Sequence, residues 1–318
     1  MVLISCNNQP TEKPIANQFV TWKGIGPDKW ASIWLIKTAI DPNAQITFIE
    51  IGEKPTSGTP FDIPTAPPYI RTGQHTTYET LTKGFQITDT TILEVGKIIR
   101  DIEIDAWAPN TSEASAYLED AFRGLQFTYG RENVPMNCYL NLFSNLQSYI
   151  ATNETDVNGE QLQKALAHNR SCASSTKLKP INDEKYVSEW RPEQILGFID
   201  AGDKVVFIDT RETDEFEEGH IPGAINIKLR ELDNPLPKSI AEADVVIPYC
   251  VKDFRGFEVA KKLKLQGIEK VGLMNPWGIS GWKATGLPVT GTKALTLADA
   301  QEKLKQCANK PTECINNG

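Results

Sequence analysis

Cys250 and Arg255, a cysteine and an arginine separated by four residues, are the side chains of this chain best placed to do chemistry together. Cys250 follows the apolar run Val245–Tyr249, which predicts a buried strand, and precedes a segment with the apolar spacing of a helix. Ligands of open α/β sheets bind at the carboxyl ends of strands, and backbone N–H groups at a helix start favour an anion. With positive charge from Lys252 and Arg255, this loop predicts a nucleophilic Cys250 that has a lowered thiol pKa and holds a bound anion.

Four segments flank this loop in the C-terminal half of the chain. They read VVFIDTR at residues 205–211, EGHIPGAIN at 218–226, GISGW at 278–282 and GLPV at 286–289. In order and spacing they resemble the rhodanese-like sulfurtransferase family across residues 186–292. The alternation of strands and helices here also predicts an α/β domain with a mainly parallel sheet and helices on both faces.

The resemblance implies persulfide chemistry at Cys250. The thiolate would attack an anionic sulfur donor such as thiosulfate and deliver the sulfane sulfur to a thiol or a cyanide-like acceptor. Loop amides would stabilise the persulfide anion, and no cofactor is implied. The loop is shorter than that of the phosphatase relatives, which favours sulfur over phosphorus. The resemblance further assigns substrate binding to Val251, Lys252, Asp253, Phe254, Arg255 and Gly256, and supporting roles to Asp209, Arg211 and His220.

The chain departs from the family's pattern at three positions. Asp253 stands where the family often has glycine, Val251 where it often has arginine, and Trp277 where it has the first of two glycines. An acidic side chain beside the thiolate would oppose anion binding by like-charge repulsion, which brings a preference for thiosulfate into question. The alternative function is a protein that binds an oxyanion, or senses redox state through oxidation of Cys250, without turnover. In that case Cys250 could also be a buried bystander.

The N-terminal half predicts a helix-rich α+β domain with few strands. Asp41-Pro42 should end its first helix, because the residue before a proline avoids helical geometry. The apolar spacing predicts a helix start at residues 26–30, a strand at 45–51, and helices at 90–101, 112–125 and 139–149.

Part of this half resembles the chromate-resistance exported protein family across residues 19–150. The resemblance rests on WLIK at 34–37, IDPNA at 40–44, FDIP at 61–64, YETL at 78–81 and IIRD at 98–101. Many relatives place Cys or His near positions held here by Ser32, Arg71, Thr72 and Thr76, which leaves His75 as the candidate ligand. A lone histidine is far more often a surface residue, so no metal site is predicted. The resemblance implies a domain that binds a partner or an oxyanion in a chromate or oxidative-stress setting.

The chain length and the changes in composition predict two domains joined by a linker. Residues 169–185 are rich in Ser, Lys, Asn and Pro and are expected to form this linker. Residues 190–201 are expected to form the first helix of the second domain, and a helix over 297–307 should be capped by Thr296. The expected segments are a tether at 1–17, domains at 18–168 and 186–292, and a C-terminal helix and tail at 293–318.

The six cysteines bear on the cellular compartment. Leu3-Ile4-Ser5-Cys6 resembles a bacterial lipobox, in which Cys6 would be lipidated and the protein anchored in the periplasm. The residues before Cys6 are too few for a signal sequence, so a chance match and a cytoplasmic protein are the alternative. Four further cysteines allow three disulfide pairings. Cys307 with Cys314 would close a small loop, and Cys138 with Cys172 would tie the first domain to its tail; four unpaired thiols in a cytosolic protein are the alternative.

The composition argues against several partners. The net charge of −8 disfavours binding to nucleic acid or to an anionic membrane surface. No apolar run is long enough for a membrane-spanning helix. The chain has only three histidines and no Cys-x-x-Cys pair, so a structural zinc site is not predicted.

Overall fold

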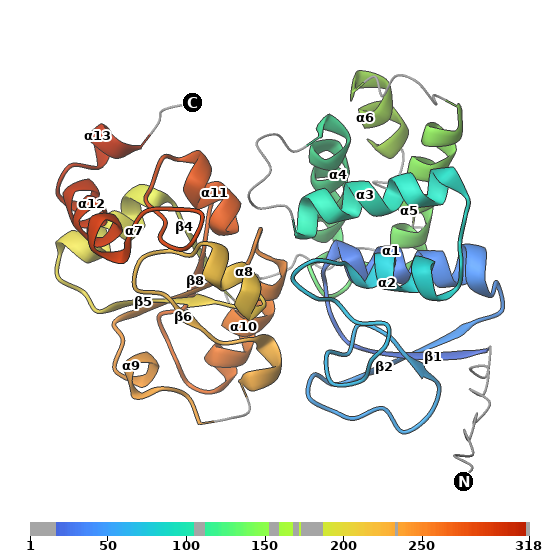
Figure 1. The fold of residues 1–318 in the computed structure, drawn as a ribbon, viewed down its shortest axis with the longest axis horizontal. Coiled ribbons are helices and arrows are strands. Elements are labelled where there is room, and N and C mark those ends of the chain that lie inside the picture. Colours follow the sequence, from blue (N-terminus) through green and yellow to red (C-terminus); the bar gives the residue numbers. More distant parts are fainter. Residues whose placement is uncertain are drawn as a thin grey trace, which may run out of the picture.

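The computed structural model describes residues 17–104, 112–152, 159–167, 172, 187–232 and 235–315. The chain forms two units of helices and strands that lie side by side (Figure 1). The N-terminal unit contains a small parallel sheet with the strand order β2-β1-β3. Its strands are β1 (Gln18–Trp22), β2 (Gln45–Ile49) and β3 (Thr59–Pro60).

Helices make up most of the N-terminal unit and are stacked on one side of its sheet (Figure 1). They are α1 (Pro27–Leu35) with its π-helical continuation Ile36–Ile40, α2 (Thr77–Gly84), α3 (Thr90–Glu103), α4 (Glu113–Tyr129), α5 (Met136–Thr152) and α6 (Gly159–Ala167). The first helical segment ends before Asp41-Pro42, as predicted. The hydroxyl of Ser112 accepts a hydrogen bond from the Ser115 N–H at 3.2 Å and so caps α4. The expectation of a helix-rich mixed unit is confirmed.

The C-terminal unit is built on parallel strands. Strands β6-β5-β7 form one sheet and β4-β8 another, and a parallel bridge from Val246 to Val271 joins them. Along β7, Val246 packs into one buried cluster, whereas Val245 and Ile247 pack into a second cluster on the other face. The strands are β4 (Ser188–Trp190), β5 (Val205–Asp209), β6 (Ile225–Asn226), β7 (Val245–Tyr249) and β8 (Gly272–Met274).

Helices cover both faces of these strands, which confirms the predicted α/β fold. The helix α10 packs on the Val246 face, and α7 and α12 pack on the opposite face. The helices are α7 (Pro192–Asp200), α8 (Thr213–Glu218), α9 (Lys238–Ala241), α10 (Phe254–Leu265), α11 (Gly278–Ala284), α12 (Leu297–Asn309) and α13 (Pro311–Cys314), with a 3₁₀ turn at Leu229–Glu231.

Two expectations about the helices of this unit can be compared with the structure. The hydroxyl of Thr296 accepts a hydrogen bond from the Asp299 N–H at 3.3 Å and caps α12, as predicted. The prediction of a helix from residue 190 is wrong at its start. Trp190 belongs to strand β4 and lies opposite Met274, and α7 begins only at Pro192, whose fixed φ suits the first helical position.

The two units share one continuous buried core through α10. Phe254, Val259 and Leu263 of α10 belong to the same cluster as Trp34 and Phe122 of the N-terminal unit. In Figure 1, α10 lies on the side of the C-terminal unit that faces the N-terminal unit. The helix that follows Cys250 therefore also takes part in the contact between the units.

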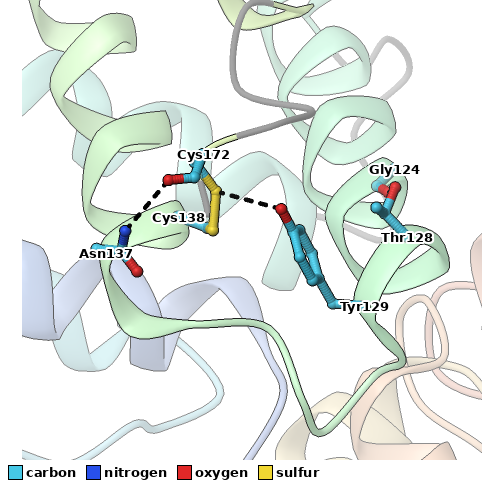
Figure 2. The surroundings of a disulfide bond; sticks show 6 residues. All are labelled: Gly124, Thr128, Tyr129, Asn137, Cys138 and Cys172. Atoms are coloured by element: carbon cyan, nitrogen blue, oxygen red, sulfur yellow. Dashed lines mark hydrogen bonds between the residues drawn. A yellow bond between two sulfur atoms is a disulfide. The ribbon is translucent and has the colours of Figure 1, made fainter. Parts of the chain in front are cut away.

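Both disulfides suggested by the spacing of the cysteines are present, Cys138–Cys172 and Cys307–Cys314. Figure 2 shows the first of them, with the Asn137 amide donating to the Cys172 carbonyl at 3.4 Å and the Tyr129 hydroxyl 3.9 Å from the Cys172 sulfur. It ties the segment after α6 to α5. Cys6, the expected tether at 1–16 and the expected linker apart from Cys172 lie outside the described residues.

Within the ranges that the structure describes, no helix is both long and apolar enough to cross a membrane.

The buried stripe of α3 allows a test of the N-terminal core. Ile99 is fully buried, whereas Leu93 on the same helix is 38% exposed. We expect Ile99→Ala to lower the free energy of unfolding by about 2–5 kcal/mol, because it leaves a cavity. Leu93→Ala should cost less than about 1 kcal/mol. Denaturant unfolding followed by circular dichroism measures both, and equal losses would contradict this account of the core.

Candidate active site

The strand–loop–helix segment around Cys250 forms as predicted. Cys250 follows β7 directly, and α10 begins four residues later at Phe254. A Cβ atom on Gly256 would lie 3.0 Å from the Pro248 carbonyl oxygen, so glycine allows α10 to start close against β7. Cys250 is 1% exposed and sits at the carboxyl end of a central strand.

Helix α11 holds the backbone of the Cys250 loop from one side. The Ile279 N–H donates to the Cys250 carbonyl at 2.9 Å, and the Ser280 N–H donates to the Val251 carbonyl at 3.1 Å. Gly278 has a φ of 65°, and a Cβ atom there would lie 1.8 Å from the Lys252 carbonyl oxygen. Only glycine therefore fits this position. The carbonyl oxygens of Cys250 and Val251 thus accept hydrogen bonds from α11.

The expected lowering of the Cys250 thiol pKa is wrong. Burial is the largest influence and raises the pKa of Cys250 above its ordinary value, because it disfavours the thiolate. Arg255 and the Gly256 N–H lower this pKa, whereas Glu103 and Asp253 raise it, and the net shift is upward. The sequence pattern revealed the loop amides and the arginine, but it could not reveal how deeply the thiol is buried.

Arg255 keeps hydrogen-bond donors available near the sulfur. Its Nη1 lies 3.6 Å from a carboxylate oxygen of Glu215 on α8. Its Nε and Nη2 atoms are buried and have no hydrogen-bond partner among the described residues. A guanidinium with two such donors can bind an anion in bidentate geometry. Arg255 thus has donors free for an anion, and its substrate-binding role stays a prediction.

Lys252 and Asp253 do not act as the sequence suggested. Lys252 pairs with Glu119 of α4 at 3.0 Å, so its charge is directed to the N-terminal unit. Asp253 is 1% exposed and pairs with Arg123 at 2.7 Å and with Arg131 at 2.5 Å. Burial alone would raise the pKa of Asp253, but the two arginines outweigh it and hold that pKa below its usual value.

The expected repulsion of an anion by Asp253 is therefore largely compensated. Asp253 still raises the pKa of Cys250, but less than burial and Glu103 do. The positive charge that balances Asp253 comes from α4 and from the segment after it, which the motif around Cys250 does not contain.

Two further loop residues serve packing. Phe254 meets Phe122 of α4 edge-on, with ring centroids 5.7 Å apart. Val251 is 1% exposed and belongs to the buried cluster on the other face of the sheet. Neither side chain is available to a ligand as these contacts stand, so the predicted substrate-binding set is reduced to Arg255 and Gly256.

The other unusual position, Trp277, faces the same part of the N-terminal unit. The guanidinium of Arg123 lies 3.7 Å from the centroid of the Trp277 ring and 4.5 Å from that of Phe254. Two of the three departures from the family's pattern, Asp253 and Trp277, thus contact one arginine of the N-terminal unit. They are explained by packing between the units.

The expected supporting residues shape the neighbouring turn. Arg211 and Asp209 form a fully buried ion pair at 2.6 Å, and Arg211 also donates to the Gly219 carbonyl at 2.6 Å. His220 stacks on Phe216 with centroids 3.7 Å apart, and its Nδ1 lies 2.8 Å from the Phe216 carbonyl. These contacts fix the turn beside β5, in agreement with a structural role for all three residues.

The sequence did not identify two carboxylates at the contact between the units, those of Glu103 and Glu258. Glu103 is 5% exposed, pairs with Arg71 at 2.8 Å, and raises the pKa of Cys250. Glu258 of α10 accepts a hydrogen bond from the Ile25 N–H at 2.8 Å, and burial raises its pKa to about 7. For the arginines that pair with Asp253, one signal was present in the sequence. An acidic residue at this loop position requires a cationic partner if it is buried.

The described residues form no cluster of side chains that could bind a metal ion. In the described ranges no group of three or more His, Cys, Asp or Glu side chains is placed to hold an ion. His75 is exposed, and its N–H donates to the Thr72 hydroxyl at 3.0 Å. Ser32 is fully buried, and Thr76 caps α2.

Comparison with known proteins assigns each unit to a family. Residues 19–150 match the family model of the ChrB C-terminal domain, and residues 192–285 match that of the rhodanese-like domain. The HTH-type transcriptional regulator Rv0324 of Mycobacterium tuberculosis is 35% identical over 100 residues, which are 30% of this chain and 42% of that protein. A Bacillus subtilis protein named "Putative sulfur carrier protein YrkF" is 31% identical over 84 residues, 26% of this chain and 44% of its own. The chain spans less than half the length of either relative.

Two solved structures are also similar to parts of the chain. One is a Rhodopseudomonas palustris protein described as a "Possible Tyrosine Phosphatase", with 22% identity, a TM-score of 0.30 and coverage of 33% of this chain and 85% of its own. The other is the Alr3790 protein from Anabaena, with 21% identity, a TM-score of 0.29 and coverage of 40% of this chain and 96% of its own.

The raised thiol pKa predicts how Cys250 reacts with an alkylating reagent. Because only the thiolate reacts, the rate of alkylation of Cys250 by iodoacetamide should rise with pH and reach half its maximum at a higher pH than that of an unstructured cysteine peptide. Mass spectrometry of the Cys250 peptide measures the rate. A half-maximum below that of the free peptide would show that the loop amides and Arg255 outweigh burial.

Proposed function

The chain joins a ChrB C-terminal domain to a rhodanese-like domain, and we propose that it is a sulfurtransferase that carries sulfane sulfur on Cys250. One observation carries this proposal. Arg255, whose buried Nε and Nη2 have no hydrogen-bond partner among the described residues, favours the charged form of Cys250, and the Gly256 N–H acts in the same direction. That arrangement suits a nucleophile that holds a negatively charged second sulfur.

The reaction balances without a further redox partner. The Cys250 thiol loses its proton to solvent, and the thiolate attacks the outer sulfur of a donor such as thiosulfate. A Cys–S bond forms, the sulfur–sulfur bond of the donor breaks, and sulfite leaves with the electron pair. An acceptor such as cyanide or a thiol then attacks the outer sulfur of the persulfide, and Cys250 returns as the thiolate. Arg255 binds the anionic donor and stabilises the persulfide charge.

The contacts around the loop support donors and acceptors of low molecular weight. Cys250 is 1% exposed, and Lys252, Asp253 and Phe254 all contact the ChrB domain. A macromolecular acceptor would have to displace these contacts to reach the sulfur. The proposed partners are therefore a small anionic sulfur donor and a small thiol or cyanide-like acceptor.

A periplasmic location, with a lipid anchor at Cys6, is part of the proposal. The disulfides Cys138–Cys172 and Cys307–Cys314 support it, because such bonds persist in oxidising compartments. A cytoplasmic protein is the alternative.

One observation favours a second function, a sensor that binds an oxyanion without turnover: Arg255 has buried Nε and Nη2 donors with no partner among the described residues. A protonated, buried Cys250 exchanges sulfur slowly at neutral pH, and its oxidation to a sulfenic acid also requires the thiolate. In this alternative the ChrB domain would report the bound oxyanion in a chromate or oxidative-stress setting.

Sulfur loading tests the proposed function. After incubation with thiosulfate, the intact mass of the protein should increase by one sulfur atom, and cyanide should release thiocyanate with turnover. Cys250→Ser should show neither change while keeping the fold, as judged by circular dichroism. A folded wild-type protein that gains no sulfur and releases no thiocyanate would contradict thiosulfate transfer and favour the sensor.

A further inference from the structure

The carboxylate of Asp253 lies between two arginines that belong to the other domain. Arg123 pairs with its Oδ1 at 2.7 Å and Arg131 pairs with its Oδ2 at 2.5 Å. Asp253 stands at the N-cap position of α10, where an aspartate usually accepts hydrogen bonds from the first turn. Its side chain makes no such hydrogen bond. The carboxylate therefore serves the contact between the domains.

Both arginines make further contacts that hold them in place. Arg123 donates from Nε and Nη2 to Glu119 at 2.9 and 2.7 Å, and its guanidinium lies over Trp277 of the rhodanese domain. Arg131 pairs with Glu189 at 3.1 Å and lies 4.7 Å from the centroid of Phe257. Stacked, ion-paired guanidinium groups of this kind have few alternative positions.

Glu119 extends the contact to a second residue of the loop. One of its oxygens accepts from Arg123 and the other lies 3.0 Å from the Nζ of Lys252. The consecutive residues Lys252 and Asp253 are thus both fixed by α4 and the segment after it. The loop between Cys250 and Arg255 is held by α11 on its own domain and by ion pairs from the ChrB domain.

We infer that Arg123 and Arg131 are positioning residues of the sulfur-transfer site, because they hold Asp253 and so fix the Cys250 loop, a role that rests on the proposed function. The ChrB domain is then a working part of the transferase site. Sulfur transfer by the rhodanese domain depends on this contact.

The charges around Cys250 make the inference measurable. Arg255 favours the thiolate, and Glu103 of α3 and Asp253 oppose it, while Glu215 of α8 lies against Arg255. Removing an arginine leaves Asp253 with less compensation, which disfavours the Cys250 thiolate. Removing the Asp253 charge as well cancels that effect, so the two substitutions should be coupled.

The experiment is a double-mutant cycle on the full chain with Arg131→Gln, Asp253→Asn and the combination of both. The rate of Cys250 alkylation is followed against pH by mass spectrometry of the Cys250 peptide, together with kcat and KM for thiosulfate and cyanide. Arg131→Gln should move the alkylation profile to higher pH and reduce the rate at neutral pH by less than about tenfold, the change that one pK unit produces. The double variant should recover most of that loss.

Matched variants separate charge from general destabilisation. Lys97→Gln removes a positive charge from an exposed pair with Glu94 on the same domain and should leave the profile unchanged. Arg131→Lys keeps the positive charge, so its alkylation profile should lie close to that of the wild type. If Arg131→Gln does not fold, Arg123→Gln takes its place in the same cycle with Asp253→Asn, because it removes the other cation that pairs with Asp253.

Coincident profiles for Arg131→Gln and wild type, or strictly additive effects in the double variant, would overturn the inference. Alkylation requires no sulfur donor. A coupled cycle in a protein that forms no persulfide would therefore refute the sulfurtransferase while retaining the arginine–Asp253 contact as a control on Cys250 reactivity. If the protein forms a persulfide but the effects of Arg131→Gln and Asp253→Asn are not coupled, the sulfurtransferase would stand and the positioning role of the arginines would be refuted.

Discussion

The structure depends on the neutralisation of one buried carboxylate, that of Asp253. A carboxylate that is 1% exposed cannot remain charged without close cations, and the cations here are Arg123 and Arg131 of the other domain. Because Asp253 lies between Cys250 and Arg255, this requirement connects domain packing to the sulfur site. The core that continues from α10 into the N-terminal helices reinforces the same contact. The two domains meet at the loop that follows Cys250.

The electrostatic balance at Cys250 keeps the free cysteine in its unreactive form. Burial keeps the free thiol protonated, and Glu103 and Asp253 act in the same direction. Arg255 and the Gly256 N–H act in the opposite direction, and in the proposed reaction they would stabilise the negative charge of the second sulfur. Such a site limits unwanted reactions of the empty cysteine, since only the thiolate reacts readily with oxidants and alkylating reagents.

The sequence predicted the parts of this site that local patterns determine. The apolar run Val245–Tyr249, the loop after it and the helix beyond were correct because strand and helix spacing is written in adjacent residues. The three-residue strand Ser188–Trp190 was missed, because so short a segment shows no alternation. The thiol pKa was predicted in the wrong direction, because a motif contains the loop amides but not the burial. The role of Asp253 was misjudged for a related reason: its partner Arg131 is 122 residues away in the chain.

A crystal structure of the thiosulfate-treated protein tests the central claim most directly. We expect a second sulfur bonded to the Cys250 sulfur, within hydrogen-bonding distance of Arg255, while Asp253 remains between Arg123 and Arg131. A sulfur-loaded Cys250 in a loop that has separated from both arginines would contradict the claim that the ChrB domain forms part of the site. Unmodified Cys250 with the donor bound elsewhere would contradict the persulfide itself.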